Sequence, residues 1–352
     1  MAFQDYEIHV FITNYIPEDV SLKSKISDFI RPRMSYAYLR SWIRLLKHGT
    51  RGQQPWKRDV MTIPRERASN LRNSYLAQVI RALEMIPCKS LSINIYSNKK
   101  QSIPITKDST QVSWTVKESF KRMNSFNNSP WEEDDPDSPW NLVWENRATL
   151  QRLHDTELPE KILFLILEND VLFSAENLIY WLDQREKLRK SGLLPGFIRV
   201  EYSNIRNEWL CIDIHDRKYL DTPDFIKRHE ISRSSYLQIS KLYNGLIVLD
   251  KDLLGEFVKS IAFDKRLSKS LIWWDMGARA SAGLQFVNTP QGFSDRYLIA
   301  YDESNEELHL GSSVHHLPNL YSAVQEVSAN MPSLREMNKM ASQKRSLMFR
   351  KN

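Results

Sequence analysis

Residues 161–170 read KILFLILEND, an apolar run that ends abruptly in polar and acidic residues. A continuous apolar run of this length is typical of a strand that is covered on both faces of an α/β sheet. Parallel strands present their carboxyl ends at one edge of a sheet, where open α/β folds bind ligands. The stretch therefore predicts the fold class and also the place of a functional site.

Three further segments surround this strand with the pattern of an α/β fold. Residues 7–13 (EIHVFIT) and 90–96 (SLSINIY) predict strands, and residues 70–85 between them predict an amphipathic helix. Strand, helix, strand is the order of a parallel crossover unit. After Glu168-Asn169-Asp170, which we call the END segment, Ser174 is a candidate N-cap for a helix over 174–190. We expect an α/β fold with a mostly parallel sheet flanked by helices, in a single large domain with insertions.

The rest of the chain predicts shorter elements and one irregular region. Strands are expected at 197–202, 208–214 and 246–249, a helix at 251–262, and a polar stretch from 215 through His229. Residues 101–150 are expected to be less ordered, because 130–140 (PWEEDDPDSPW) concentrates acids and prolines in a predicted surface loop.

The composition is that of an ordinary globular protein. The 352 residues include 49 Lys and Arg and 43 Asp and Glu, a formal net charge of +6, with 41% hydrophobic residues. These proportions exclude disorder, collagen and coiled coil as descriptions of the whole chain. Two cysteines, Cys88 and Cys211, without metal-ligand spacing favour a reducing, cytoplasmic location. Because no run of about 18 apolar residues occurs, we expect neither a membrane-spanning helix nor a secretory signal.

Basic residues gather in two segments. Residues 31–72 mix Lys and Arg with Trp42 and Trp56, a pattern that single-stranded nucleic-acid grooves use and that a solvated helix face also produces. The tail at 335–351 has helical character and a basic face, so peripheral contact with an anionic membrane and a frayed, solvated terminus are both open. A net charge of +6 over the whole chain identifies no partner by itself.

The END segment is a candidate metal site. Glu168 and Asp170 are two residues apart and follow the central strand directly. Mg²⁺ and Mn²⁺ prefer hard oxygen ligands and commonly take one or two carboxylates together with substrate phosphates. An acidic turn that caps the next helix would contain the same residues. The segment thus predicts a site for Mn²⁺ or Mg²⁺, with the helix-cap interpretation as the alternative.

Four segments, in order, resemble motifs of the GT-A-fold glycosyltransferases. Residues 163–182 (LFLILENDVLFSAENLIYWL) resemble the diphosphate–metal motif written DxD or EDD. Residues 243–249 (YNGLIVL), a helix and Phe263-Asp264 are similar to the glycine loop, strand and GGFD segment. The sequence Trp273-Trp274-Asp275, with Arg279 and Gly283 after it, lies where the xED motif falls. Residues 314–319 (VHHLPN) resemble the late histidine motif of the metal site.

The likeness covers about residues 5–321 and includes two departures. Asn169 replaces the usual middle acid, and Trp274 replaces the Glu of xED, so that Asp275 stands alone. The resemblance implies a metal held by Glu168, Asp170 and one of the two histidines, His315 or His316, with a slight preference for His316. It also implies that Asp275 is the general base of an inverting transfer, a role for which a structural helix-start carboxylate is the alternative.

A further set of residues is expected to border the nucleotide at the same sheet edge. These candidates are Thr13, Asn14, Tyr15, Ser97, Asn98 and Gly245. Tyr15 is a candidate to stack on the base, and ordinary turn roles are the alternative for the loop positions. The expected regions are a nucleotide-binding half at 1–100 with an insertion at about 30–68, an acidic insertion at 101–150, a metal and acceptor half at 151–330, and a basic tail at 331–352.

The leading hypothesis is a metal-dependent glycosyltransferase that moves a sugar from a nucleotide-sugar donor to a glycan or glycolipid precursor. One alternative is a binding protein for nucleic acid or another anionic polymer, with residues 31–72 as its surface. Another is a metal-dependent nucleotidyltransferase, which would attack phosphorus instead of the sugar. The order of four motifs favours the first hypothesis, so nucleic acid is not expected as a partner.

Overall fold

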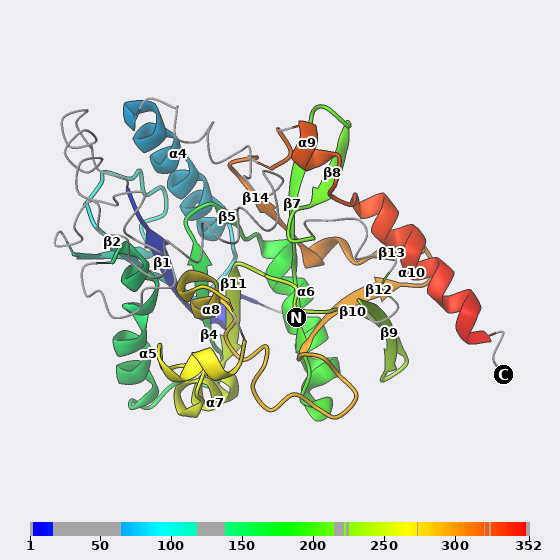
Figure 1. Cartoon of the computed structure of the whole chain (residues 1–352). Coiled ribbons are helices and arrows are strands. Elements are labelled where there is room, and N and C mark those ends of the chain that lie inside the picture. Colours follow the sequence, from blue (N-terminus) through cyan, green and yellow to red (C-terminus); the bar gives the residue numbers. More distant parts are fainter. Residues whose placement is uncertain are drawn as a thin grey trace, which may run out of the picture.

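Strand β1 (Glu7–Asn14) is central to the first sheet, and helix α4 (Arg65–Glu84) leads to its parallel neighbour β2 (Ser90–Ser97). The computed structural model describes residues 3–16, 65–117, 138–214, 222, 225–272, 274–319, 321–323 and 325–349 (Figure 1). Glu7 lies opposite Ser90 and Asn14 opposite Ser97 in the parallel register. The predicted strand–helix–strand unit is confirmed.

Within the described residues, the first sheet contains five strands, in the spatial order β11 (Leu246–Asp250), β4 (Ile162–Glu168), β1, β2 and β3 (Thr110–Val116). Strand β1 pairs in parallel with both β2 and β4, and β2 pairs in parallel with β3. Strand β11 pairs with β4 in the antiparallel direction. The chain therefore adds β2 and β3 on one side of β1 before it places β4 on the other side.

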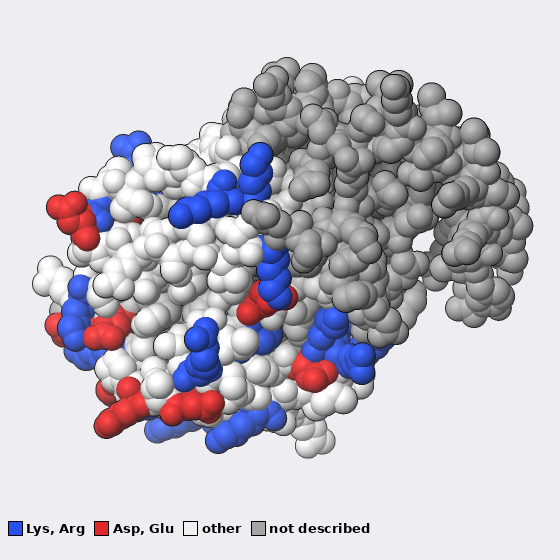
Figure 2. All heavy atoms as spheres, turned by 90° about the vertical axis from the view of Figure 1, so that its left-hand side faces the viewer, with Lys and Arg blue, Asp and Glu red and all other residues white. Residues whose placement is uncertain are grey.

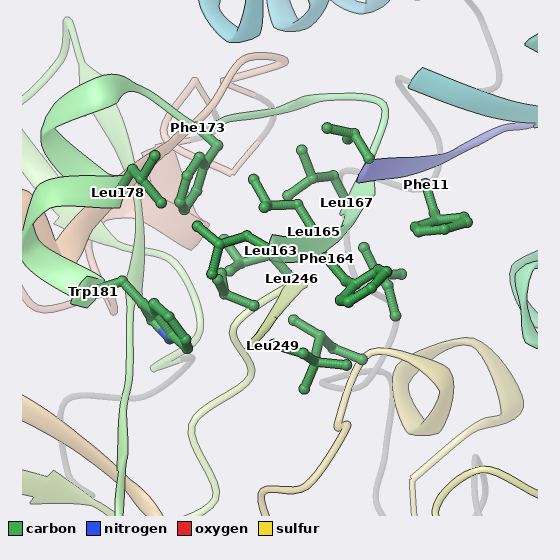
Figure 3. Close-up of a cluster of buried hydrophobic side chains, with 14 of the residues drawn as sticks. Phe11, Leu163, Phe164, Leu165, Leu167, Phe173, Leu178, Trp181, Leu246 and Leu249 are labelled. Atoms are coloured by element: carbon green, nitrogen blue, oxygen red, sulfur yellow. The ribbon is translucent and has the colours of Figure 1, made fainter. Parts of the chain in front are cut away.

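Strand β4 forms the middle of the main hydrophobic core. Ile162–Leu167 are all buried, as the uninterrupted apolar run predicts. Phe173, Leu178 and Trp181 gather beside this strand (Figure 3). Burial of side chains of this size stabilises a fold by about 1.5–3 kcal/mol each, so β4 is firmly held where it ends at Glu168.

Two smaller sheets follow in the second half of the chain. One has the order β13 (Glu307–Leu308), β12 (Tyr297–Asp302), β10 (Ser234–Ile239) and β9 (Ile226–Ile231), with β6 (Leu194–Pro195) paired to β12. The other has the order β5 (Val171–Leu172), β14 (Ser313–His316), β7 (Ile198–Ser203) and β8 (Glu208–Cys211). Strand β14 is parallel to β7 and antiparallel to β5.

The helices flank these sheets. They are α5 (Asn146–His154), α6 (Ala175–Leu188), α7 (Lys251–Lys259), α8 (Met276–Ala280), α9 (Gln325–Ser328) and α10 (Leu334–Phe349), besides α4. Short 3-10 helices occupy Phe3–Asp5, Pro139–Trp144, Arg189–Ser191, Leu267–Ser270 and Leu310–Ser312. Ser174 caps α6 by accepting the Asn177 amide, which confirms that prediction. Helix α10 buries Met337 and Ala341 in a second hydrophobic cluster with β7–β10 residues.

The architecture is thus one α/β domain with mixed sheets and flanking helices. A mostly parallel sheet is not confirmed, because β11 reverses direction and the later sheets are built largely from antiparallel pairs. Within 101–150, where the sequence predicts less order, the structure describes β3, the 3-10 helix at Pro139–Trp144 and the start of α5, while residues 118–137 lie outside the described residues. Strands β9 and β10 were not predicted, because most of their residues are polar and do not show a regular alternation of apolar and polar positions.

Several sequence predictions fall outside the described residues. These include most of the insertion at about 30–68, most of the acidic loop at 130–140, Trp273 and the last residues of the basic tail. Among the helices that the structure describes, none is both long and apolar enough to cross a membrane.

Candidate functional site

The candidate site lies at the carboxyl ends of β1 and β4. The sheet order changes direction between these two strands, because β2 and β3 were added on the opposite side of β1. In open α/β sheets, ligands bind outside the carboxyl ends of strands at such a switch point. Thr13 of β1 lies opposite Glu168 of β4 in the register, so the two strand ends are level with each other.

Buried amides connect the strand ends. Asn169 Nδ2 donates to Asn14 Oδ1 at 2.6 Å, and Asn14 Nδ2 donates to Gln101 Oε1 at 3.3 Å. Ser97 Oγ donates to the Asn14 carbonyl at 2.7 Å. Asn98 exchanges two hydrogen bonds with the backbone of Ile16, at 2.7 and 2.9 Å. The structure thus brings Asn14, Ser97 and Asn98 to the expected edge, where their polar groups bind one another and the backbone.

Tyr15 and Gly245 have different surroundings. Tyr15 is partly buried and packs against the main core. Gly245 has φ +67°, and a Cβ atom there would lie 2.9 Å from Arg199 Cδ and 3.3 Å from Glu168 Oε2. A side chain at position 245 would therefore displace Arg199, so this glycine makes room for a protein side chain.

Glu168 belongs to a compact cluster that we call the Arg199 group, made of Glu168, Arg199, Asp213 and Tyr243. Arg199 Nη1 donates to Glu168 Oε2 at 3.0 Å, and its Nη2 donates to Asp213 Oδ1 at 2.6 Å. The Tyr243 hydroxyl donates to Glu168 Oε1, and the guanidinium carbon lies 4.4 Å from the Tyr243 ring centroid. Both oxygens of Glu168 thus have protein donors.

Burial and charge fix the protonation states within the Arg199 group. Burial opposes the charge on Arg199, but the Asp213 and Glu168 carboxylates raise its pKa well above the usual value. Burial raises the pKa of Tyr243, and the nearby Glu168 charge adds to this effect. The guanidinium therefore stays charged and the phenol stays protonated, as hydrogen-bond donors to Glu168 must.

Asp170 belongs to a second cluster, the His316 group, made of Asp170, Glu201, His316 and Tyr321. His316 Nδ1 donates to Glu201 Oε1 at 2.6 Å, and its Nε2 lies 3.8 Å from Asp170 Oδ2. Glu201 is fully buried, and its Oε2 accepts the backbone amides of Tyr321 (2.9 Å) and Ser322 (2.7 Å). Glu201 therefore fixes both the orientation and the tautomer of the imidazole.

The 3.8 Å between His316 Nε2 and Asp170 Oδ2 is too long for a hydrogen bond. When Nδ1 carries the proton, Nε2 presents a lone pair towards a carboxylate oxygen, and two such atoms attract a cation. Metal bonds to His nitrogen and carboxylate oxygen are each about 2.0–2.2 Å, so both atoms are close enough to share one ion. A His that donates its other ring proton to a carboxylate is the usual arrangement of a metal-binding imidazole.

Helix α4 lies next to the His316 group. Burial raises the pKa of Tyr75, and the charge of Asp170 raises it further. Asp170 also accepts the Leu317 amide through its backbone carbonyl at 2.8 Å, which ties the END turn to the end of β14. The turn, α4 and β14 thus surround the same small region.

The two histidines occupy different environments because adjacent residues of a strand face opposite sides. His316 is buried and faces Asp170, whereas His315 contacts the Trp209 ring at 5.1 Å and Asn319 Oδ1 at 3.3 Å. Burial lowers the pKa of His315, and the Asn319 hydrogen bond opposes this change. The structure therefore brings His316 to the acidic turn and leaves His315 on the other face of β14.

Asp275 is the N-cap of α8. Its Oδ1 accepts the Ala278 amide at 2.8 Å, the role that the alternative interpretation predicts. The preceding Trp274 contacts the Tyr243 ring, with centroids 5.8 Å apart. The start of α8 is thus connected to Glu168 through one ring contact, between Trp274 and Tyr243, and one hydrogen bond, from Tyr243 to Glu168.

The donor set limits the metal that the site can hold. Among the described residues, no three His, Cys, Asp or Glu side chains come together as a metal-binding group. Asp170 and His316 fit a metal as two protein ligands, and the oxygens of Glu168 are bound to Arg199 and Tyr243. Two protein ligands suffice for Mg²⁺ or Mn²⁺ when substrate phosphates complete the coordination.

Sequence reasoning missed Arg199, Glu201 and Asp213 as site residues. The strand at 197–202 reads FIRVEY, in which Arg199 and Glu201 alternate with apolar residues. Charged residues two apart in an otherwise apolar strand share one face and must find partners when they are buried. This alternation indicates that Arg199 and Glu201 have buried polar partners, although it does not identify those partners.

The face of the molecule in Figure 2 shows no continuous basic surface among the described residues. On the face that Figure 2 presents, Lys and Arg side chains lie beside Asp and Glu, with uncharged surface between them. Most of the basic segment at 31–72 lies outside the described residues. Neither a protein-family model nor a curated protein matches the sequence.

Proposed function

We propose that this protein is a glycosyltransferase that moves a sugar from a nucleotide-sugar donor to a glycan or glycolipid precursor, with Mn²⁺ or Mg²⁺. The convergence of Asp170 and His316, with His316 oriented by the buried Glu201, is the observation that carries the proposal. Its position at the switch point between β1 and β4 supports a phosphorylated ligand at this edge. The four motifs that resemble GT-A-fold enzymes support a sugar donor.

The His316 group supplies what the donor diphosphate requires. A divalent ion bound there would offset the negative charge that develops on the diphosphate as the sugar leaves. Asp170 and His316 would hold the ion, and the hydrogen bond between His316 Nδ1 and Glu201 would direct Nε2 towards it. Glu168 acts indirectly, because it fixes Arg199 and Tyr243 beside the ligand position.

An inverting transfer also needs a base for the acceptor hydroxyl. We assign this role to Asp275, which stands at the start of α8 next to Trp274 and the Arg199 group. The capping bond to Ala278 holds its carboxylate in one rotamer, and a base must be held in this way. A lipid-linked acceptor would agree with the exposed Arg335 and Lys339 of α10 facing an anionic membrane.

Incubation with labelled nucleotide sugars and Mn²⁺, followed by product analysis, tests the proposal. The expected product is a glycoside of inverted configuration together with a free nucleoside diphosphate. Asp170→Asn should abolish transfer, and Asp183→Asn, an exposed carboxylate on α6, is the matched control. A nucleotide transferred intact to the acceptor would identify a nucleotidyltransferase. Nucleic-acid binding without turnover of any donor would favour the binding-protein hypothesis.

A further inference from the structure

Arg147 is a buried cation that pairs with no carboxylate among the described residues. It lies on α5, and its guanidinium carbon is 5.1 Å from the Trp144 ring centroid, 4.6 Å from that of Phe257 and 5.6 Å from that of Phe263. A cation is stabilised less by an aromatic face than by a carboxylate. The three rings therefore form a cage that offsets only part of the cost of burying the charge.

The hydrogen bonds of Arg147 point to one neighbour in particular. Nη2 donates to the carbonyl of Ala280, the last residue of α8, at 2.8 Å, and Nη1 donates to Asn146 Oδ1 at 2.9 Å. Within the described part of the chain, Nε is buried without a hydrogen-bond partner. Burial lowers the pKa of Arg147 to about 9. A buried charge with an unsatisfied donor destabilises a fold. The contact between Arg147 and α8 is therefore not explained by a gain in stability.

Helix α8 is held at both ends by the same segment. Trp144 Nε1 donates to the Met276 carbonyl at 3.2 Å, and Arg147 binds the Ala280 carbonyl. Helix α5 is itself fixed to the first sheet, because the Tyr96 hydroxyl of β2 donates to Thr149 Oγ1 at 2.9 Å. The position of this five-residue helix is thus set from the sheet through α5.

The other side of α8 leads to the candidate site. Asp275 caps the helix, Trp274 contacts the Tyr243 ring, and Tyr243 donates to Glu168 at the end of β4. A continuous series of contacts therefore runs from β2 through α5 and α8 back to β4. Arg147 contributes a planar set of donors to this series, which a lysine cannot replace.

We propose that Arg147 is a positioning residue, which holds α8 through the Ala280 carbonyl and so places Trp274 and Asp275 against Tyr243. Its effect on transfer rests on the proposed function, whereas its effect on α8 does not. The guanidinium is retained for the geometry of α8, although its burial stabilises the fold little.

Hydrogen exchange on Arg147→Lys and Arg147→Met tests the assignment, with Arg152→Lys as a control on the exposed side of the same helix. The amides of Ala278 and Arg279, which bind Asp275 in the folded state, should exchange about 10- to 100-fold faster in both Arg147 variants. In Arg147→Met, exchange of β4 amides and the melting temperature should change little, because Met removes a costly buried charge. Arg152→Lys should leave all of these quantities unchanged.

Unchanged exchange at Ala278 and Arg279, or equal acceleration in β4, would overturn the assignment. If the protein transfers sugar, the Arg147 variants should lose turnover while their Mn²⁺ affinity and donor KM stay within about twofold. A parallel loss of Mn²⁺ affinity would also contradict a role confined to α8. If no donor is turned over by the unaltered protein, the proposed function fails, and the exchange result still decides the role of Arg147.

Discussion

The Arg199 group and the His316 group share one strand end but differ in how their charges are satisfied. In the first group, a guanidinium and a phenol bind both oxygens of Glu168. In the second, Asp170 Oδ2 faces His316 Nε2 across 3.8 Å, beyond hydrogen-bond length. Two carboxylates only two residues apart therefore have different surroundings: Glu168 completes an ion pair with Arg199, and Asp170, which we propose as a metal ligand, faces His316.

The difference arises because β4 ends at Glu168, so that Asp170 lies in the following turn, and because different strands lie beside the two residues. Glu168 still belongs to β4 and points to the side where β7 brings Arg199 and the turn before β11 brings Tyr243. Asp170 follows the strand and meets β14 through its own backbone carbonyl. The predictions below test this division, from the largest expected effect to the smallest.

Arg199→Met should destabilise the protein by about 3–5 kcal/mol at pH 7, because it leaves two carboxylates without their cation. Those carboxylates can then accept protons, so the loss should shrink as the pH falls towards 5. Urea unfolding at both pH values measures the effect. Arg189→Met is the control, since its ion pair with Asp252 is mostly exposed and contributes less than about 1 kcal/mol. An equal loss of stability in Arg199→Met and Arg189→Met would contradict the difference between the buried and the exposed ion pair.

Asp295 is a buried carboxylate with no cation partner in the described residues, in contrast to Asp213. Burial raises its pKa to about 6, and the backbone amides of Lys241 and Tyr297 oppose the rise. Between pH 3.8 and about 6 the unfolded chain ionises Asp295 while the folded chain keeps the proton. Stability should therefore fall by about 3 kcal/mol as the pH rises through this window.

Asp295→Asn should remove this fall. The stability of the variant relative to the unaltered protein should increase with pH between 4 and 7, as measured by urea unfolding. Asp302→Asn should show a pH dependence of opposite direction, because hydrogen bonds from Ser304 lower the pKa of Asp302. A relative stability of Asp295→Asn that does not vary with pH would mean that Asp295 is not protonated in the folded state.

The first prediction depends on contacts that the sequence does not reveal, which marks the limit of sequence reasoning here. The strand at 161–167, the Ser174 cap and the strand–helix–strand unit were predictable, because apolar periodicity and capping are local properties. Arg199 reaches Glu168 across 31 positions, and Tyr243 reaches it across 75. Such pairs depend on strand register, which no local pattern encodes for a chain with mixed sheets.

Asp170→Asn should lower Mn²⁺ affinity by about 10- to 100-fold, whereas Glu168→Gln should change it by less than about threefold. Asp170 faces Nε2 of the imidazole, whereas Glu168 is bound by Arg199 and Tyr243. Calorimetry with Mn²⁺ alone measures both affinities without a donor or an acceptor. A larger loss in Glu168→Gln than in Asp170→Asn would reverse the division between the two groups.

The smallest effect concerns the residue behind His316. Glu201→Gln keeps the volume and one hydrogen-bond acceptor but removes the charge that favours a proton on Nδ1. Mn²⁺ affinity should fall by about tenfold, because loss of the partner that orients a ligating imidazole costs at least that much. His315→Ala, on the opposite face of β14, should leave the affinity within about twofold, since its ring contacts Trp209 and Asn319. If both variants lose affinity equally, the loss arises from damage to β14 and not from the orientation of His316. If neither variant loses Mn²⁺ affinity, His316 does not bind the ion, and the proposed pair of ligands is wrong.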